Sequence, residues 1–266
     1  MLLEKGRHYA PGVGEPSSMP LNDPCDEGIR LAQEAATRHL PVKLLGGVAV
    51  FVRCPSAKLP ALSRTYGDVD VISLSSERRK ITGFLEEMGY QPDKLFNALH
   101  GATRLNFMDV DRERPLDVLL DRFVMCHTID FRHRLELEPL TIPLVDLLLT
   151  KLQVVRINSK DHKDLIALLA DHPLGGTAGD SIDVGRMTSL LGTDWGFEHT
   201  VRQNLVGVRS SLRDLELPPG MADAVSERIA SILSALDTGR KSLRWKSRAI
   251  VGERVRWYEL PEDVRH

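Results

Sequence analysis

The sequence contains little cysteine and almost no net charge. Its three cysteines, Cys25, Cys54 and Cys126, are odd in number and far apart. This pattern excludes a disulfide framework and the ligand spacing of a zinc site, and it is typical of a reducing cytosol. The formal net charge of -2 over 266 residues excludes a global attraction to nucleic acid. Any such binding would need a local basic patch.

Long apolar runs are also missing. The segment Ile142-Pro-Leu-Val-Asp-Leu-Leu-Leu149 is interrupted by Asp146, so it does not read as a membrane span. The sequence from Met1 to His8 lacks the apolar core of a signal peptide. Hydrophobic content of 42% and charged content of 27% are those of an ordinary globular chain, which at this length forms one or two domains. We therefore expect a cytoplasmic protein with no membrane partner.

Two acidic residues stand one residue apart in Arg64-Thr-Tyr-Gly-Asp-Val-Asp-Val-Ile72. Because successive side chains of a β-strand point to opposite faces, Asp68 and Asp70 should project on the same side. Two carboxylates at this spacing offer hard oxygen ligands for a divalent cation such as Mg²⁺ beside a phosphate. Taken alone, the triplet is more typical of a solvated strand face, so other features have to decide.

Two further features favour a site. The diglycine Gly46-Gly47 follows an apolar run and precedes Val48-Ala-Val-Phe-Val52. This pattern predicts a strand, a tight turn and a helix whose first amides can approach a phosphate. A third acid, Asp117, lies in the apolar segment Arg114-Pro-Leu-Asp-Val-Leu-Leu120, which could form a strand beside the first. Asp111 is a rival for this third position, but it falls in a charged turn where solvation explains it.

These features together resemble a known family. The order Gly-Gly, then Arg-x-x-x-Asp-hydrophobic-Asp, then hydrophobic-Asp-hydrophobic is similar to the nucleotidyltransferase superfamily with the polymerase-beta-like catalytic core. Downstream, Lys151-Leu-x-x-x-Arg156 and Lys160-Asp161-His-Lys-Asp164-Leu165 resemble the helical half of the AbiEii/AbiGii-type nucleotidyltransferase toxins. The resemblance covers roughly residues 40–170, about the length of a typical domain.

The resemblance implies a metal-dependent enzyme that transfers a nucleotide from an NTP donor to an acceptor hydroxyl. The implied ligands of two Mg²⁺ ions are acidic: Asp68, Asp70 and Asp117. The implied nucleotide-binding residues surround the triphosphate: Gly46, Gly47, Arg64, Lys151 and Asp164. Lys151 is also implied in catalysis beside the three aspartates, and Asp117 would serve as general base.

The resemblance to the toxins further suggests an RNA acceptor, such as the acceptor end of tRNA, and an antitoxin protein as partner. Two alternatives stay open. One is a small-molecule acceptor such as an aminoglycoside, which calls for an acidic cleft. The other is a nucleotide- or metal-binding module without turnover. A departure from the family supports the second, because Val48 and Tyr66 stand where relatives usually carry small hydroxyl residues.

For the fold, we expect the α+β class: a small mixed-sheet nucleotidyltransferase core flanked by helices and followed by a helical C-terminal part. Residues 1–24 are rich in Gly, Pro and Ser and predict an irregular arm. Residues 25–138 would form the catalytic domain, and residues 139–266 a helical domain with a basic tail.

Hydrophobic spacing gives the individual elements. The predicted strands are 42–45, 103–108 and 116–120, besides the strand that carries Asp68 and Asp70. The predicted helices are 26–39, 48–53, 75–88, 182–192, 194–213 and 219–238. The first helix of the second part should be capped by Thr141, with Pro143 in its first turn.

Lys151 shares an apolar stripe of that helix with Leu144 and Leu148. Burial of an ammonium group is unfavourable unless an anion meets it. That anion is either a triphosphate or a carboxylate, such as Asp164 in a clasp between two helices. The two interpretations are compatible, since one charge pair can both orient the lysine and serve catalysis.

The C-terminal segments Gly239-Arg-Lys-Ser-Leu-Arg-Trp-Lys-Ser-Arg248 and Arg254-Val-Arg-Trp-Tyr258 interleave basic and aromatic residues. Such a combination can grip phosphates and stack bases. The simpler alternative is a solvated basic helix whose Trp245 and Trp257 pack on the core, and charge runs of this kind favour it.

Overall fold

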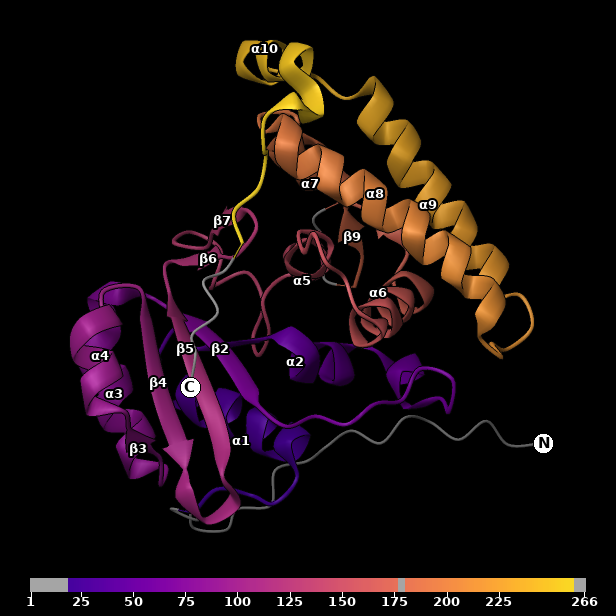
Figure 1. Cartoon of the computed structure of the whole chain (residues 1–266). Helices are drawn as coiled ribbons and strands as arrows, with labels where there is room; N and C mark the ends of the chain where they lie inside the picture. The colour runs from indigo at the N-terminus through magenta and orange to yellow at the C-terminus, as the bar shows by residue number, and fades with distance from the viewer. Residues whose placement is uncertain (1–18, 177–179, 261–266) are drawn as a thin grey trace.

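A five-stranded mixed β-sheet organises the first half of the chain (Figure 1). The computed structural model describes residues 19–176 and 180–260. The strands lie in the order β1-β2-β5-β4-β3, and the β2–β5 pair is parallel whereas the other three pairs are antiparallel. Their bounds are β1 Lys43–Leu45, β2 Val69–Ser73, β3 Gln91–Pro92, β4 Arg104–Asp109 and β5 Arg114–Leu120. The predicted α+β class is confirmed.

Four helices accompany this sheet: α1 Pro24–Thr37, α2 Gly46–Arg53, α3 Arg78–Glu87 and α4 Lys94–His100. Helix α1 begins at Pro24, two residues before the start of the helix predicted over 26–39. Its start is fixed by Asp23, whose carboxylate accepts hydrogen bonds from the Cys25 and Asp26 amides at 2.8 and 3.0 Å. Such side-chain caps satisfy amides that have no partner within the helix.

The helix after the diglycine begins at the diglycine itself. Gly46 has a φ of +67°, in the left-handed region that favours glycine. Its Cα faces the neighbouring strand so closely that an added Cβ would lie 2.4 Å from Asp70 Oδ2. The turn between β1 and α2 therefore requires glycine for two reasons, backbone conformation and space.

The central strand β5 alternates strictly between buried and partly exposed residues. Leu116, Val118 and Leu120 point into the core, as expected for a strand with one apolar face. Asp117 and Leu119 point to the opposite face, where they remain partly accessible. This alternation leaves one face of the sheet free to carry polar side chains.

Helices dominate the second half of the chain: α5 Leu144–Leu152, α6 Ser159–Asp171, α7 Val184–Leu191, α8 Trp195–Ser211, α9 Met221–Thr238 and α10 Leu243–Val251. Helices α8 and α9 lie side by side, and α10 lies at the end of the molecule away from α1 (Figure 1). The helices predicted over 182–192, 194–213 and 219–238 are confirmed as α7, α8 and α9, with shorter ends.

The predicted cap of α5 is wrong. The helix begins at Leu144 after Pro143, with no side-chain cap, and Thr141 lies three residues before it. The reason is a continuation of the sheet: Leu44 N donates to Leu140 O at 2.9 Å, and Ile142 N donates to Leu44 O at 3.0 Å. Residues 140–142 are thus extended beside β1. The Thr141 hydroxyl instead accepts a hydrogen bond from Arg53 at 3.1 Å.

Several small elements were not predicted. Besides β3 and α4, they are the hairpin β6 Arg122–Val124 with β7 Thr128–Asp130, and the parallel pair β8 Leu174–Gly175 with β9 Ile182–Asp183. Most of the predicted N-terminal arm, residues 1–18, lies outside the described residues, as do residues 177–179 of the predicted linker and 261–266 of the tail.

One cluster of buried apolar residues extends from Cys25 on α1 to Leu236 on α9. It crosses the predicted domain boundary near residue 139, so both parts contribute to the same core; the boundary itself stays a prediction. Within residues 19–176 and 180–260, no helix combines the length and the apolar character that a membrane crossing needs.

Replacement of Gly46 by alanine should destabilise the fold. An alanine in the left-handed region costs about 1–2 kcal/mol, and its Cβ would also press on Asp70. Gly83→Ala is the matched control, because Gly83 lies on α3 with open space around an added Cβ; this change should stabilise by about 0.5–1 kcal/mol. Urea unfolding of both variants measures the difference, and equal effects would contradict the account of the turn.

Candidate active site

Asp70 and Asp117 are direct partners in the register of the parallel pair β2–β5. Side chains of partner residues in adjacent strands lie on the same face of a sheet. On its other side, Asp70 pairs with Leu45, the last residue of β1, so that the diglycine follows at once. The close approach of Gly46 to Asp70 completes the arrangement. Two of the three predicted acids and the diglycine thus lie together.

The third acid, Asp68, is exposed and lies just before β2. The negative charge of Asp68 nevertheless affects the pKa of Asp70. Burial, together with the nearby charges of Asp68 and Asp117, raises the pKa of Asp70 to about 7, although Lys151 and Arg104 act in the opposite direction. The shift has two physical causes: the carboxylate loses hydration, and like charges in a small space disfavour simultaneous ionisation.

Asp117 is held by cationic and amide groups of the neighbouring strand β4. Arg104 donates two hydrogen bonds to its two carboxylate oxygens at 3.0 and 2.8 Å, and Asn106 donates a third at 3.0 Å. Such a two-pronged arginine–carboxylate pair fixes the carboxylate in one orientation. Asp117 therefore turns its oxygens to Arg104 in this structure.

These residues fit a divalent cation in part. The oxygens of Asp68 and Asp70 have the hard-ligand chemistry that Mg²⁺ prefers, and a cation would relieve the repulsion that raises the pKa of Asp70. In the described part of the chain, no group of three or more His, Cys, Asp or Glu side chains is arranged to hold a metal ion. Of the three acids, Asp117 is the one whose two oxygens already accept hydrogen bonds from Arg104 and Asn106.

The predicted ion pair between Lys151 and Asp164 is present, and it includes a second carboxylate, that of Asp161. Lys151 Nζ lies 2.8 Å from Asp164 Oδ2 and 3.0 Å from Asp161 Oδ1. Burial alone would lower the pKa of Lys151, but the two carboxylates more than offset this, so its pKa lies above the ordinary value. The lysine is accordingly charged despite its burial on α5.

Arg64 joins the same carboxylate from the loop before β2. It donates to both oxygens of Asp164 at 2.9 Å each. Its guanidinium lies so close to Gly47 that an added Cβ there would be 1.7 Å from Nη2. Two cations are thereby held beside the first turn of α2, where the helix also presents backbone amides.

The two departures from the family pattern have different structural consequences. Val48 is buried, and its Cγ1 packs against Gly28 of α1, so this side chain faces the core and not the diglycine turn. Tyr66 holds Arg64 instead, with the guanidinium carbon 4.4 Å from the ring centroid. The Tyr66 hydroxyl is buried without a hydrogen-bond partner among the described residues.

Sequence reasoning missed Arg104, Asn106 and, as a partner of Lys151, Asp161. A signal existed for the first two, because Arg104 and Asn106 alternate along a predicted strand and so share one face. Their relation to Asp117 depends on the register of β4 with β5, in which Asn106 and Asp117 are partners. The rival acid Asp111 lies exposed in the connection between these strands, as its charged surroundings predicted.

No protein-family model matches this chain, and no curated protein shows significant sequence similarity to it. The relation to the nucleotidyltransferases therefore depends on the motif resemblance and stays a prediction.

Asp164→Asn should destabilise the fold strongly, because it leaves Arg64 and Lys151 buried with insufficient negative charge. Removal of one partner of a buried ion pair costs roughly 3–5 kcal/mol. Asp161→Asn is the matched control: Lys151 keeps Asp164, so the loss should be about 1–2 kcal/mol. Chemical denaturation of both variants tests this, and equal stabilities would show that Asp164 is not the shared partner.

The raised pKa of Asp70 predicts a pH dependence of stability. Between its ordinary value of 3.8 and about 7, the folded protein binds a proton that the unfolded chain has lost. The free energy of unfolding should therefore fall as pH rises through this window and then level off. The difference between wild type and Asp70→Asn, measured by urea unfolding from pH 4 to 8, isolates this group. A difference that stays constant with pH would contradict the shift.

Proposed function

We propose that this protein is a metal-dependent nucleotidyltransferase that moves a nucleotide from an NTP to an acceptor hydroxyl. The observation that carries the proposal is the position of Asp70 between Asp117 on the next strand and the Gly46 turn. Carboxylates beside a helix N-terminus with two nearby cations can bind a metal-bound triphosphate.

Each group has a role that follows from its position. Asp68 and Asp70 would hold the metal, which when bound polarises the phosphate and stabilises the charge of attacking and leaving oxygens. The amides at the start of α2, with Arg64 and Lys151, would bind the phosphates and oppose the charge that develops on leaving pyrophosphate. Asp164 would orient both cations, since each already donates to it.

Asp117 has two states in this proposal. In the first, Arg104 donates to both of its oxygens and lowers the capacity of the carboxylate to bind a cation or accept a proton. In the second, without Arg104, Asp117 would keep the hydrogen bond from Asn106 and could hold a metal beside Asp70 or accept the proton of the acceptor hydroxyl. Arg104 would thus keep the site from completing until the substrates are in place.

The nature of the acceptor is the second question. A small cationic acceptor such as an aminoglycoside calls for an acidic cleft, whereas the cleft beside Arg104 also contains Arg244, Arg248 and Arg256. This favours an anionic acceptor such as RNA. An antitoxin partner stays a prediction of the family resemblance alone. A binding module without turnover remains the competing proposal, and the Arg104–Asp117 pair is the observation that favours it.

Turnover with labelled NTPs tests the proposal. The purified protein is incubated with each α-labelled NTP, Mg²⁺ and total RNA, and in parallel with small hydroxylated acceptors. Asp68→Ala combined with Asp70→Ala should reduce label transfer at least about 100-fold, since loss of metal-bound charge stabilisation removes several kcal/mol. Retained transfer by this double variant would refute the assignment.

The matched control is Asp111→Ala combined with Glu86→Ala, which removes the same charge from two exposed positions. It should transfer label as the wild type does. Label in RNA supports the RNA acceptor, and label only in small molecules supports the alternative acceptor. Absence of transfer by the wild type, with NTP binding intact, supports the binding module.

A further inference from the structure

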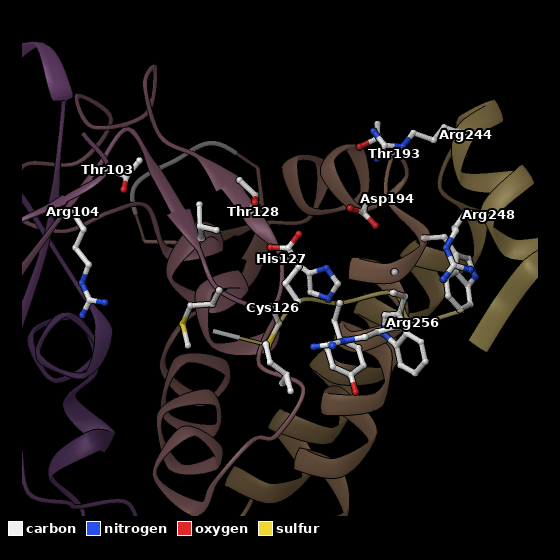
Figure 2. Close-up of a pocket in the computed structure, with 18 of the residues that line it drawn as sticks. Thr103, Arg104, Cys126, His127, Thr128, Thr193, Asp194, Arg244, Arg248 and Arg256 are labelled. Atoms are coloured by element: carbon white, nitrogen blue, oxygen red, sulfur yellow. The ribbon is translucent and has the colours of Figure 1, made fainter. Parts of the chain in front are cut away.

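A cleft of about 1420 Å³ lies between α4 with the start of β4 on one side and the C-terminal segment around α10 on the other. Figure 2 shows Arg104 on one side of it and Arg244, Arg248 and Arg256 on the other. Small-molecule sites typically measure about 300–1,000 Å³. The size of this cleft therefore favours an extended chain over a single small ligand.

The far wall of the cleft is fixed to the rest of the molecule. After α10 the chain returns toward β6 and β7 (Figure 1), where Glu259 N donates to Cys126 O at 3.1 Å. Trp257 Nε1 donates to Thr200 Oγ1 at 3.1 Å, and Trp245 Nε1 donates to Glu198 at 3.0 Å. Both tryptophans are half-buried and hydrogen-bonded to α8, but neither is among the side chains that pack against the apolar core, so the predicted packing on the core stays a prediction. They position the wall, on which Arg244 and Arg256 are exposed.

The arginines on this wall are ordered by local contacts. Arg248 donates to the carbonyl oxygens of Gly252 and Val255 at 2.6 Å each, and its guanidinium carbon lies 4.9 Å from the Trp195 ring centroid. The guanidinium carbon of Arg256 lies 4.9 Å from the centroid of the Tyr258 ring. Both terminal nitrogens of Arg248 are thus engaged, whereas the exposed guanidinium of Arg256 can offer two N–H groups to phosphate oxygens.

The charge of the cleft is positive. Four arginines line it, of which Arg104 is paired with Asp117, whereas the acidic side chains in its lining are Asp194 and Glu259. Asp194 is already engaged as the cap of α8, where it accepts a hydrogen bond from Phe197 N at 3.0 Å. The molecule as a whole has a net charge of only -2, so this cleft is the local basic patch that nucleic-acid binding would need.

Arg104 connects the cleft with the candidate active site. Its guanidinium lies 5.8 Å from the ring centroid of Phe96, another lining residue, and bonds to Asp117. Asp117 is in turn the register partner of Asp70. A phosphate chain lying along the cleft would therefore come next to Asp117 where it contacts Arg104.

We propose that this cleft binds the phosphate backbone of a single-stranded nucleic acid and directs its end toward Asp70 and Asp117. The identity of this chain as the acceptor rests on the proposed function, whereas its binding does not. Arg244 and Arg256 hold the backbone, and a phosphate that draws Arg104 away from Asp117 frees that carboxylate for catalysis. Acceptor binding and completion of the site are thereby coupled.

Binding of a fluorescein-labelled single-stranded RNA oligonucleotide, followed by anisotropy over a range of salt concentrations, tests this. The variant is Arg244→Glu with Arg256→Glu, at two exposed cleft positions. Its affinity should be at least about tenfold lower than that of the wild type. Because each phosphate contact on a single strand contributes about 0.7 to the salt slope, the slope should decrease by about 1.4.

The matched control is Arg209→Glu with Arg213→Glu, which makes the same charge change at exposed positions beyond the cleft. Arg209 is on α8, about 20 Å along the helix from Trp195. The control should bind the oligonucleotide within about twofold of the wild type, as expected when no phosphate contact is lost. Equal affinities of the cleft variant and the control would overturn the proposal, and tighter binding of an annealed duplex would overturn the single-strand assignment.

The measurement contains no NTP, so its outcome is independent of turnover. A wild type that binds the oligonucleotide but transfers no label disproves the proposed function and leaves the cleft assignment intact. A wild type that transfers nucleotides to small molecules but shows no affinity for the oligonucleotide disproves the cleft assignment and leaves the proposed nucleotidyl transfer intact.

Discussion

The shared carboxylate of Asp164 is the interaction on which the rest of the candidate site depends. It accepts hydrogen bonds from Arg64 of the loop before β2 and pairs with Lys151 of α5, while itself belonging to α6. Three separate parts of the chain are thereby joined at one buried anion. Because an unpaired charge is unfavourable in the interior, none of the three can move away alone. Both cations are consequently held beside the first turn of α2.

A second constraint acts across the sheet. The register of β2 with β5 places Asp70 beside Asp117, and Lys151 and Arg104 offset only part of the burial and repulsion that raise the pKa of Asp70. Two carboxylates at this distance favour a further cation, since a metal ion would supply the positive charge that Arg104 and Lys151 now provide. Arg104 belongs both to this group of charges and to the lining of the arginine cleft. An anion in the cleft and a cation at the carboxylates would therefore favour one another.

Much of the fold was predictable from local pattern. Alternation and helical spacing predicted β1, β4 and β5 and the helices α7 to α9, because these depend on which residues must face an apolar core. The short elements β3, β6 and β7 were missed, since two or three residues carry too little periodicity to be recognised. Thr141 was assigned to a helix cap because its residue type favours one, yet hydrogen bonds to Leu44, distant in sequence, keep its segment extended. For the site, the diglycine, the acids and the Lys151–Asp164 pair were found, whereas Arg104, the counter-ion of Asp117, was not.

The sequence by itself determined the chemical groups of this protein: a glycine pair that only a tight turn explains, acids at strand spacing, and a lysine on an apolar stripe. These follow from backbone sterics and from the energetic demands of burial, which act on neighbouring residues. Only the tertiary structure decided which charges meet. Arg104 faces Asp117 because two strands pair in one register, and Arg64 shares Asp164 with Lys151 because a loop and two helices pack together. Contacts of this kind join residues far apart in the chain, and no local pattern specifies them.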